Sequence, residues 1–358
     1  MIYNKGVINQ IRLRLRDIGI DAILVNSQYD IIYLTGFYSP GVVLVIPAYE
    51  RPLYFIDKMN RALAISRLKH EFLDIITGSG IIIEIIAEQI RIKKIKNLGV
   101  GADSVSFLMY KNLCKSIPAV KIISERKGIY ITSIIKDLRK IKTAEEIDVL
   151  RKAAKETIRI WRKVKRNIKT GMNEKEIEGM VDSYIREKGY KNSFSTISAI
   201  GKNSAYPHAI AGHTKIKNQE HLLVDFGIRY HGYCSDLTRT WDNGRIDRKI
   251  KVFKRFVREA HDFAINNIRP GVQIGLLVKK VNSIFQKAGL GDFVLHGLGH
   301  GVGLNIHEEP FLRQTSQERF KRGMVVTVEP GLYEEGLGGI REEDMVLVTS
   351  KGCEVLTR

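Results

Sequence analysis

The hydrophobic pattern of the first part of the chain predicts a small unit of alternating helices and strands. Apolar residues recur at helical spacing over residues 8–18, and the continuous apolar run AILVNS follows. After a turn at residues 29–30 and the segment IIYLTGF come two more strand-like runs, GVVLVIPA and RPLYFID, and then helices from about Arg61 and Ile82. Short apolar runs bounded by turn residues are typical of buried strands. The alternation therefore predicts a mostly buried sheet with flanking helices.

A change of pattern near residues 124–130 marks the expected domain boundary. This segment, SERKGIY, is followed by the long amphipathic helical pattern RKIKTAEEIDVLRKAAKETIRIWRKVKR. Thr143 and Glu146 have the spacing of a capping box at the start of that helix. We expect an N-terminal α/β domain of residues 1–125 and a second domain of residues 126–358.

An internal repeat runs through the second domain. Residues 168–190 (IKTGMNEKEIEGMVDSYIREKGY) align with residues 268–290 (IRPGVQIGLLVKKVNSIFQKAGL) at a constant offset of 100, the distance from Gly171 to Gly271. Each copy reads as a turn that leads into an amphipathic helix ending at a glycine. We predict a pseudo-twofold domain, so that the fold class of the whole chain is α/β (α+β).

Composition limits the class of protein and the cellular compartment that can be expected. The chain has 358 residues, of which 44% are apolar, and no apolar run reaches the roughly 18 residues of a membrane span. The first residues are interrupted by Lys and Arg and do not resemble a signal peptide. The three cysteines (Cys114, Cys234 and Cys353) stand far apart, which favours a reduced, cytoplasmic protein without a disulfide framework.

The formal net charge of +19 has two interpretations. One is a nucleic acid or another anionic partner. The other is a solvated Lys/Arg-rich surface of the kind found in heat-adapted proteins. The basic residues are spread over helix-like stretches without a basic tail, so we favour the second interpretation and do not expect nucleic-acid binding.

Four carboxylates and one imidazole stand in unusual local strings of the second domain. The strings are VDFGIRYHGYCSDLTRTW, HGLGHGVGLNIHEEP, TVEPGLY and GGIREEDMVLV, and the residues are Asp225, Asp236, His300, Glu329 and Glu343. Taken singly, each has an ordinary structural explanation as a turn or solvated residue. Buried together in apolar strands, they would repel one another strongly without a cation. Because five ligands exceed the need of one ion, we predict a centre for two metal ions.

Strand geometry supports this prediction. Asp225 ends the strand HLLVD, Phe226 and Gly227 begin a turn, and Asp236 lies eleven positions later (236 − 225) on a returning strand. A hairpin of this kind can place both carboxylates on one face. Glu329 and Glu343, fourteen apart (343 − 329), would do the same in the other half.

Oxygen-rich ligation with a single histidine favours Mn or Co, and also Fe or Zn, over copper or a structural zinc site. Two such ions about 3.5–4 Å apart can share a bridging hydroxide that attacks a carbonyl. One ion would polarise the carbonyl oxygen, and the other could hold a free amine of the substrate.

These residues and strings make the chain resemble the creatinase/aminopeptidase P/prolidase family of metallopeptidases, whose catalytic domain has the pita-bread fold. The resemblance extends over nearly the whole chain, because YLTGF and DLRKIKTAEEIDVLRKAA resemble the N-terminal domain and junction helix of the proline-specific branch. It implies that Asp225 is a terminal ligand of one metal, that His300 and Glu329 are ligands of the other, and that Asp236 and Glu343 bridge both.

The resemblance also implies roles around the metals. Glu329 would shuttle a proton between the water and the leaving nitrogen, and His208 and His307 would contact the substrate and the tetrahedral intermediate. His296 matches a further active-site histidine. Arg341 matches an arginine that orients the acidic site or the substrate. Phe194 and Ile306 match apolar positions that line a proline pocket.

We therefore expect an exopeptidase that hydrolyses Xaa-Pro dipeptides, an Xaa-Pro dipeptidase or prolidase. The first alternative is an Xaa-Pro aminopeptidase acting on longer peptides. Less favoured are a non-catalytic binding protein on the same fold, against which the intact ligand set counts, and a creatinase-type enzyme acting on a small non-peptide amidine. The resemblance further implies a homodimer.

Overall fold

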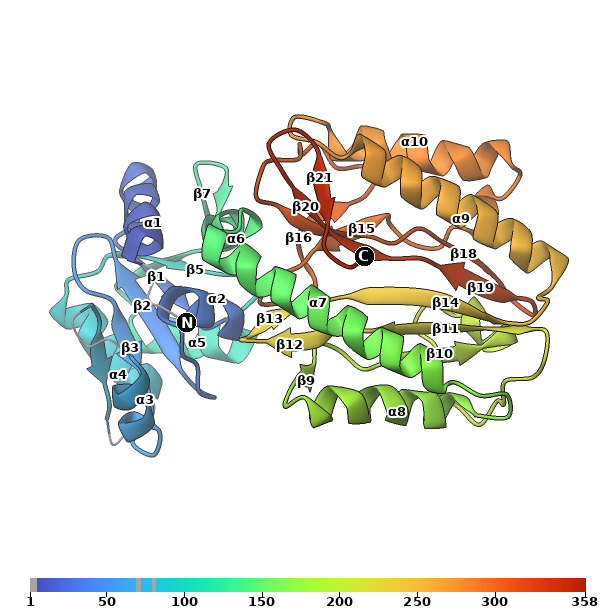
Figure 1. Ribbon diagram of the computed structural model, residues 1–358. Coiled ribbons are helices and arrows are strands. Elements are labelled where there is room, and N and C mark those ends of the chain that lie inside the picture. Colours follow the sequence, from blue (N-terminus) through green and yellow to red (C-terminus); the bar gives the residue numbers. More distant parts are fainter. Residues whose placement is uncertain (1–4, 69–71, 79–81) are drawn as a thin grey trace. The chain divides into compact units, whose positions relative to one another are not determined.

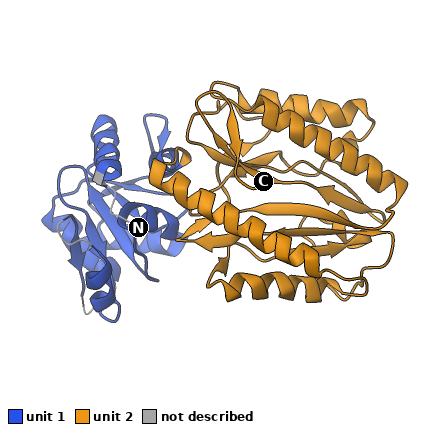
Figure 2. Cartoon of the chain, viewed as in Figure 1, with its two compact units in different colours: residues 1–139 blue, residues 140–358 orange. Residues whose placement is uncertain are grey.

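The computed structural model describes residues 5–68, 72–78 and 82–358, and the chain forms two compact units, residues 1–139 and 140–358 (Figure 2). The division therefore comes later than the expected boundary at residue 125. The helix α6 (Ile131–Lys140) is bonded to the first unit: Tyr33 donates a hydrogen bond to the Leu138 carbonyl at 3.3 Å, and Arg139 pairs with Asp30 at 2.7 Å. These contacts keep nearly all of α6 with the N-terminal unit.

The first unit is a mixed sheet flanked by helices, as the α/β pattern predicts. Its elements before α6 are α1 (Lys5–Ile18), β1 (Ala22–Val25), α2 (Gln28–Thr35), β2 (Val43–Pro47), β3 (Leu53–Phe55), α3 (Arg61–Arg67), β4 (Asp74–Ile76), α4 (Ile82–Ile92), β5 (Asn97–Val100), α5 (Phe107–Ser116), β6 (Lys121–Ile123), β7 (Glu125–Arg126) and β8 (Ile129–Tyr130). The described strands include a six-stranded sheet in the order β4-β3-β2-β1-β5-β6. The turn expected at residues 29–30 is instead the first turn of α2, because the Ser27 side chain caps the helix by accepting from the Asp30 amide.

The second unit begins with the predicted long helix. The first half contains α7 (Ala144–Asn167), α8 (Glu174–Glu187), β9 (Lys191–Asn192), β10 (Ile197–Ile200), η1 (Gly201–Ala205), β11 (Glu220–Phe226), β12 (Ile228–Tyr230), β13 (Tyr233–Cys234) and β14 (Leu237–Asn243). The capping box of Thr143 and Glu146 at the start of α7 is confirmed.

The second half contains α9 (Arg248–Asn267), α10 (Ile274–Lys287), η2 (Gly291–Phe293), β15 (Gly299–Gly301), β16 (Glu308–Leu312), β17 (Val325–Val328), β18 (Gly331–Glu334), β19 (Gly338–Arg341), β20 (Asp344–Val348) and β21 (Cys353–Val355). Its main sheet has the order β16-β15-β17-β20-β21, and that of the first half has the order β10-β11-β14.

The internal repeat is confirmed by the backbone. The helices α8 and α10 begin at residues 174 and 274. The preceding turns contain Gly171 and Gly271 with φ of 93° and 87°, a left-handed conformation that favours glycine. The amide of Gly171 donates to the carbonyl of Ile216, and that of Gly271 donates to the carbonyl of Phe320. The two halves thus use the same turn and helix, and in each half the turn glycine is bonded to a later segment of the chain.

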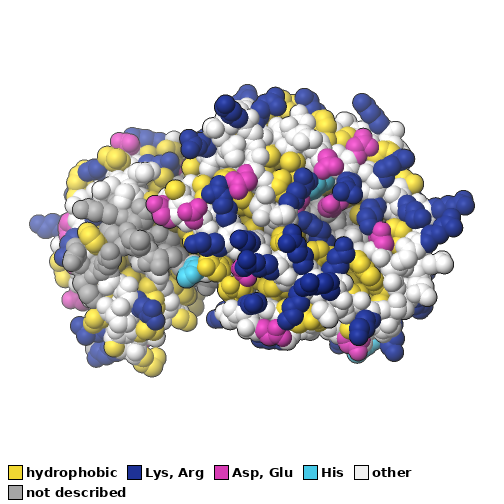
Figure 3. Space-filling view, in the orientation of Figure 1, with side chains coloured by type: hydrophobic (Ala, Val, Ile, Leu, Met, Phe, Trp, Pro, Cys, Tyr) yellow, Lys and Arg dark blue, Asp and Glu magenta, His cyan; other side chains and the backbone are white. Residues whose placement is uncertain are grey.

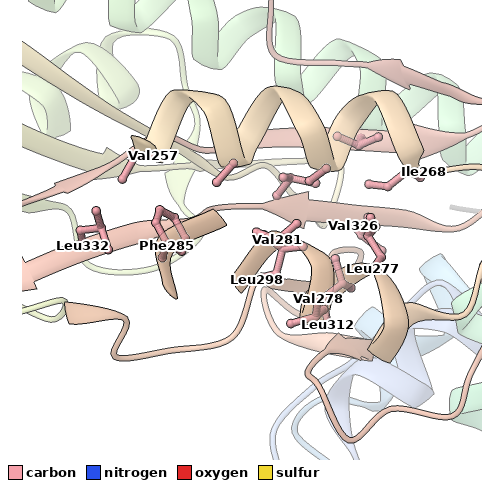
Figure 4. Close-up of a cluster of buried hydrophobic side chains, with 14 of the residues drawn as sticks. Val257, Ile268, Leu277, Val278, Val281, Phe285, Leu298, Leu312, Val326 and Leu332 are labelled. Carbon is pink, nitrogen blue, oxygen red and sulfur yellow. The ribbon is translucent and has the colours of Figure 1, made fainter. Parts of the chain in front are cut away.

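Two pairs of helices enclose the strands of this unit. In Figure 1, α9 and α10 lie above the strands, α8 lies below them, and α7 crosses in front of them. Side chains of α9 and α10, among them Val257, Leu277, Val281 and Phe285, form a buried cluster with side chains of the strands (Figure 4). Burying each such side chain contributes roughly 1.5–3 kcal/mol to the free energy of folding. This packing holds the strands that carry the acidic residues.

Basic side chains gather over the part of the second unit where α7 lies (Figure 3). Among the exposed basic residues of α7, five recur every three or four residues, which places them on one face of the helix: Lys152, Lys155, Arg159, Arg162 and Arg166. Among the described residues, no helix combines the length and the apolar character that crossing a lipid bilayer requires.

Candidate metal centre and substrate cavity

The ladder between β11 and β14 places the first two carboxylates on one face. Asp225 pairs directly with Thr238 in this antiparallel ladder. Directly opposite residues point to the same face, and so do residues two apart on one strand. Asp236 therefore lies on the same side as Asp225, as predicted. The expected simple turn at Phe226 is wrong in detail, because Phe226 still belongs to β11 and the short strands β12 and β13 intervene.

The ladder between β17 and β20 positions the other two carboxylates. Val328 pairs with Asp344, so that Glu329 and Glu343 stand opposite each other just beyond the end of the ladder. The two ladders meet at this point, since the Glu343 amide donates to the Thr238 carbonyl at 3.2 Å. One acidic pair from each half thus reaches the same region.

His300 completes the cluster from β15. Its Nδ1 bonds the Gly301 carbonyl at 3.1 Å, so Nδ1 carries the proton. Its Nε2 then has a free lone pair and lies 3.7 Å from Asp236 Oδ2 and 3.3 Å from Glu329 Oε1. This is the tautomer that a metal-ligating histidine needs.

Gly299 is required for this approach of β15 to β17. A Cβ at Gly299 would lie 2.1 Å from the Thr327 carbonyl oxygen. The glycine therefore lets the His300 amide donate to Thr327 Oγ1 at 3.0 Å. The glycine-rich string around His300 is explained by this close contact.

The donor set fits a divalent metal. Ligand atoms of Asp236, His300 and Glu343 all lie within 4.8 Å of one another. These residues are only 4%, 8% and 2% exposed, and burial followed by carboxylate repulsion raises the pKa of Asp236 and Glu343 well above their usual values. Asp225 Oδ1 is buried and has no hydrogen-bond partner. A buried, mutually repelling and incompletely bonded set of acceptors is what a cation would satisfy.

One buried arginine organises the acidic cluster. Arg341 Nη2 pairs with Asp225 Oδ2 at 2.6 Å, and Arg341 Nη1 donates to the Tyr333 hydroxyl at 2.7 Å. His296 Nδ1 bonds the Gly297 carbonyl, so its Nε2 accepts from the Tyr333 hydroxyl at 2.8 Å. Burial raises the pKa of Tyr333 to about 12 and lowers that of His296. The arrangement therefore keeps Tyr333 protonated and His296 neutral at neutral pH.

The cluster lies in a cavity of about 1230 Å³. Every residue that the sequence predicts for the site lines it: Phe194, His208, Asp225, Asp236, His296, His300, Ile306, His307, Glu329, Arg341 and Glu343. His208 and His307 are exposed, whereas the acidic residues are largely buried. The ring centroid of His307 lies 4.4 Å from that of His300. The structure thus brings the predicted residues together, from both halves of the repeat.

Several residues of the site escaped the sequence analysis. Thr238 donates to Glu343 Oε2 at 2.7 Å, and Thr327 donates to Glu329 Oε1 at 3.2 Å. Each threonine stands two positions from a predicted ligand, so strand alternation could have identified both. No sequence signal identified Tyr333, nor Arg313, which lines the cavity with its guanidinium 4.8 Å from the Phe311 ring centroid.

Comparisons with known proteins give a consistent picture. The model of "Metallopeptidase family M24" matches residues 148–350, and that of the "Creatinase/Prolidase N-terminal domain" matches residues 8–141. The Xaa-Pro dipeptidase of Pyrococcus furiosus is 38% identical over 229 residues, 64% of this chain and 66% of that protein. The structure of an Xaa-Pro dipeptidase from Bacillus anthracis matches with a TM-score of 0.92 at 31% identity, over 99% of this chain and 97% of the other. An X-Pro aminopeptidase from Thermotoga maritima matches with a TM-score of 0.85 at 29% identity, over 96% and 97% of the two chains.

Proposed function

Because the chain belongs to metallopeptidase family M24 and carries a creatinase/prolidase-type N-terminal domain, we propose that this peptidase is an Xaa-Pro dipeptidase with two divalent metal ions. The observation that carries the proposal is the convergence of four carboxylates and the lone pair of one histidine on the wall of a single large cavity.

We assign the metal ligands as follows. Asp225 would hold one ion, His300 and Glu329 the other, and Asp236 and Glu343 both. Mn or Co suits this oxygen-rich set, and Fe or Zn is compatible with it. When bound, such ions supply Lewis acidity for a peptide carbonyl and lower the pKa of water.

The remaining residues of the site handle protons and orientation. Burial raises the pKa of Glu329, which suits its carboxylate to take a proton from water and pass it to the leaving nitrogen. His307 and His208 face the same cavity and would stabilise negative charge on the reacting carbonyl oxygen. Arg341, held by Tyr333 and Thr238, would fix the orientation of the Asp225 carboxylate.

Recognition of a dipeptide needs an apolar surface and a cation. Phe194 and Ile306 line the cavity and would contact the proline ring. Two Lys or Arg side chains line the cavity among the described residues, and one of them, Arg341, is paired with Asp225. The other, Arg313, is the residue that we assign to the C-terminal carboxylate of the dipeptide, since a guanidinium binds a carboxylate strongly.

An Xaa-Pro aminopeptidase is the second candidate. The similarity to the Thermotoga maritima X-Pro aminopeptidase extends over 96% of this chain. The cavity of about 1230 Å³ is also larger than the roughly 300–1,000 Å³ of ordinary small-molecule sites, so it has room for residues beyond proline.

We also propose a cytoplasmic homodimer. All three cysteines are free in the structure, which suits a reducing compartment. The dimer follows from the family resemblance, and light scattering after size-exclusion chromatography would test it.

Peptide hydrolysis tests the function. Rates on Ala-Pro and Ala-Pro-Ala are compared, with Ala-Ala as a control, before chelation, after chelation and after addition of Mn, Co, Fe or Zn. We expect metal-dependent cleavage of Ala-Pro that exceeds cleavage of Ala-Pro-Ala. Comparable turnover of the tripeptide would favour the aminopeptidase, and absence of cleavage with every metal would overturn both assignments.

A further inference from the structure

Glu174 is a buried carboxylate that the proposed chemistry does not use. Its side chain has no exposed surface. It accepts hydrogen bonds from the amides of Ile200 and Gly212, each at 2.7 Å, and from the Asn203 side-chain amide at 2.9 and 3.0 Å to its two oxygens. All of these partners are donors, so an acceptor-only group is required at this position.

The internal repeat shows that a carboxylate is not needed here for the fold. The equivalent residue in the second half is Ile274, one hundred positions later (274 − 174), and it is fully buried in the apolar core. The surrounding backbone is bonded in the same way, since the Glu174 amide donates to the Thr214 carbonyl and the Ile274 amide donates to the Glu318 carbonyl. The same turn and helix are thus built with an apolar residue in one half and a carboxylate in the other.

The partners of Glu174 belong to one segment of the cavity wall. Ile200 precedes and Gly212 ends the segment of residues 201–212, and Asn203 lies within it. This segment carries Tyr206, His208 and Ile210, which line the cavity. Glu174 therefore fastens both ends of the segment to the start of α8, where the helix dipole also stabilises its negative charge.

We propose that Glu174 is a positioning residue that holds the His208 segment in its place against the substrate. The inference rests on the proposed function, because it assigns His208 to contact with the substrate. Glu174 acts through the position of His208 and touches neither the metal ligands nor the reacting atoms.

The variant Glu174→Gln tests this proposal, because its amide group would present a donor to partners that are themselves donors. We expect kcat/KM for Ala-Pro to fall by roughly 10- to 100-fold, the effect of a misplacement of about 1 Å, while the metal content stays the same. The matched control is Glu176→Gln, two residues along the same helix, where the side chain is exposed and bonds the Asn173 amide. The control is expected to retain the activity of the wild type.

A double-mutant cycle with His208→Ala separates positioning from general destabilisation. If Glu174 acts through His208, Glu174→Gln has no further effect on kcat/KM in the His208→Ala background. Additive losses in the cycle, or unchanged kcat/KM in the single variant, would overturn the proposal. Should Glu174→Gln not fold, Asn203→Ala replaces it in the same double-mutant cycle, with a smaller expected loss of kcat/KM.

Hydrogen exchange gives a readout that does not depend on activity. Glutamine keeps one acceptor oxygen, so in Glu174→Gln we expect whichever of the Ile200 and Gly212 amides faces the new NH2 group to exchange at least about tenfold faster, whereas amides around Ile274 are unchanged. Unchanged exchange at both amides would refute the proposal that Glu174 holds the His208 segment in place. If the wild type cleaves no Xaa-Pro peptide, the proposed function fails instead, and the exchange data still decide whether Glu174 holds the segment.

Discussion

Replacing Asp236 with Asn removes a buried charge at almost constant side-chain volume, and we expect opposite effects on the metal-free and the metal-loaded protein. Ligand atoms of Asp236 and Glu343 lie within 4.8 Å of each other. Two carboxylate charges at that distance repel by about 3.5 kcal/mol at an effective dielectric constant of about 20. Protonation relieves part of this repulsion, so the metal-free variant should gain roughly 1–3 kcal/mol of unfolding free energy.

The gain should depend on pH. Burial, and then the charge of Glu343, raises the pKa of Asp236 above its usual value in the folded protein. Asp236 of the wild type therefore makes its full contribution to the unfolding free energy below the unfolded-state pKa. This contribution is lost as pH rises through the higher folded-state pKa. The advantage of Asp236→Asn should be small at pH 4 and large at pH 8, where it corresponds to roughly 3–9 °C in the unfolding temperature of a unit of this size.

Calorimetry of chelator-treated proteins at both pH values measures this effect. Saturating Mn should reverse the order of the unfolding temperatures, because the wild type binds the metal more tightly, and activity of the variant should fall by roughly a hundredfold or more. The control is Asp242→Asn on the same strand β14, where the carboxylate pairs with Lys254 at 2.6 Å near the surface and contributes little. A metal-free Asp236→Asn protein that unfolds below the wild type at pH 8, while the control does not, would refute the reasoning.

Three further predictions concern the surroundings of the proposed metal centre. Arg341→Met removes the charge paired with Asp225 and should lower the stability of the metal-free protein by roughly 3–5 kcal/mol in denaturant titrations; a loss below about 1 kcal/mol would contradict it. Thr238→Val removes the hydrogen bond to Glu343 and should weaken metal binding by roughly 10- to 100-fold in calorimetric titration, and unchanged affinity would speak against this role. Arg313→Ala should raise KM for Ala-Pro by roughly tenfold or more with little change for Ala-Pro-amide; an equal effect on both peptides would exclude contact with the carboxylate.

The strands, and the acidic residues and histidine that gather at the cavity, could be predicted from the sequence because their signals are local. Apolar runs that reach Asp225 and Glu329 locate the ends of two strands to within one residue, and the constant offset of 100 between Gly171 and Gly271 is sufficient to identify the duplication. The domain boundary could not be placed as well, since α6 joins the first unit through tertiary contacts such as the pair of Arg139 and Asp30. Such contacts leave no periodic pattern in the sequence.

The hydrogen-bond partners in the interior of the protein could not be predicted from the sequence for the same reason. Tyr333 is an unremarkable aromatic residue of a strand until the fold places its hydroxyl between Arg341 and His296. Glu174 has the appearance of an ordinary first-turn acid of a helix, and only the folded chain shows that its side chain turns inward.

Glu329 and Glu343 stand directly opposite each other at the end of the β17–β20 ladder. Insertions and deletions should therefore affect activity strongly at some positions near this ladder and weakly at others. Loss of one residue within either strand would shift the pairing by one position and turn a proposed metal ligand toward the opposite face. The stretch that joins the two glutamates is itself a hairpin of β18 and β19, paired from Gly331–Arg341 to Glu334–Gly338. Variation in length is therefore tolerated at the tip of that hairpin, whereas the number of residues in β17 and β20 cannot change without displacing a glutamate.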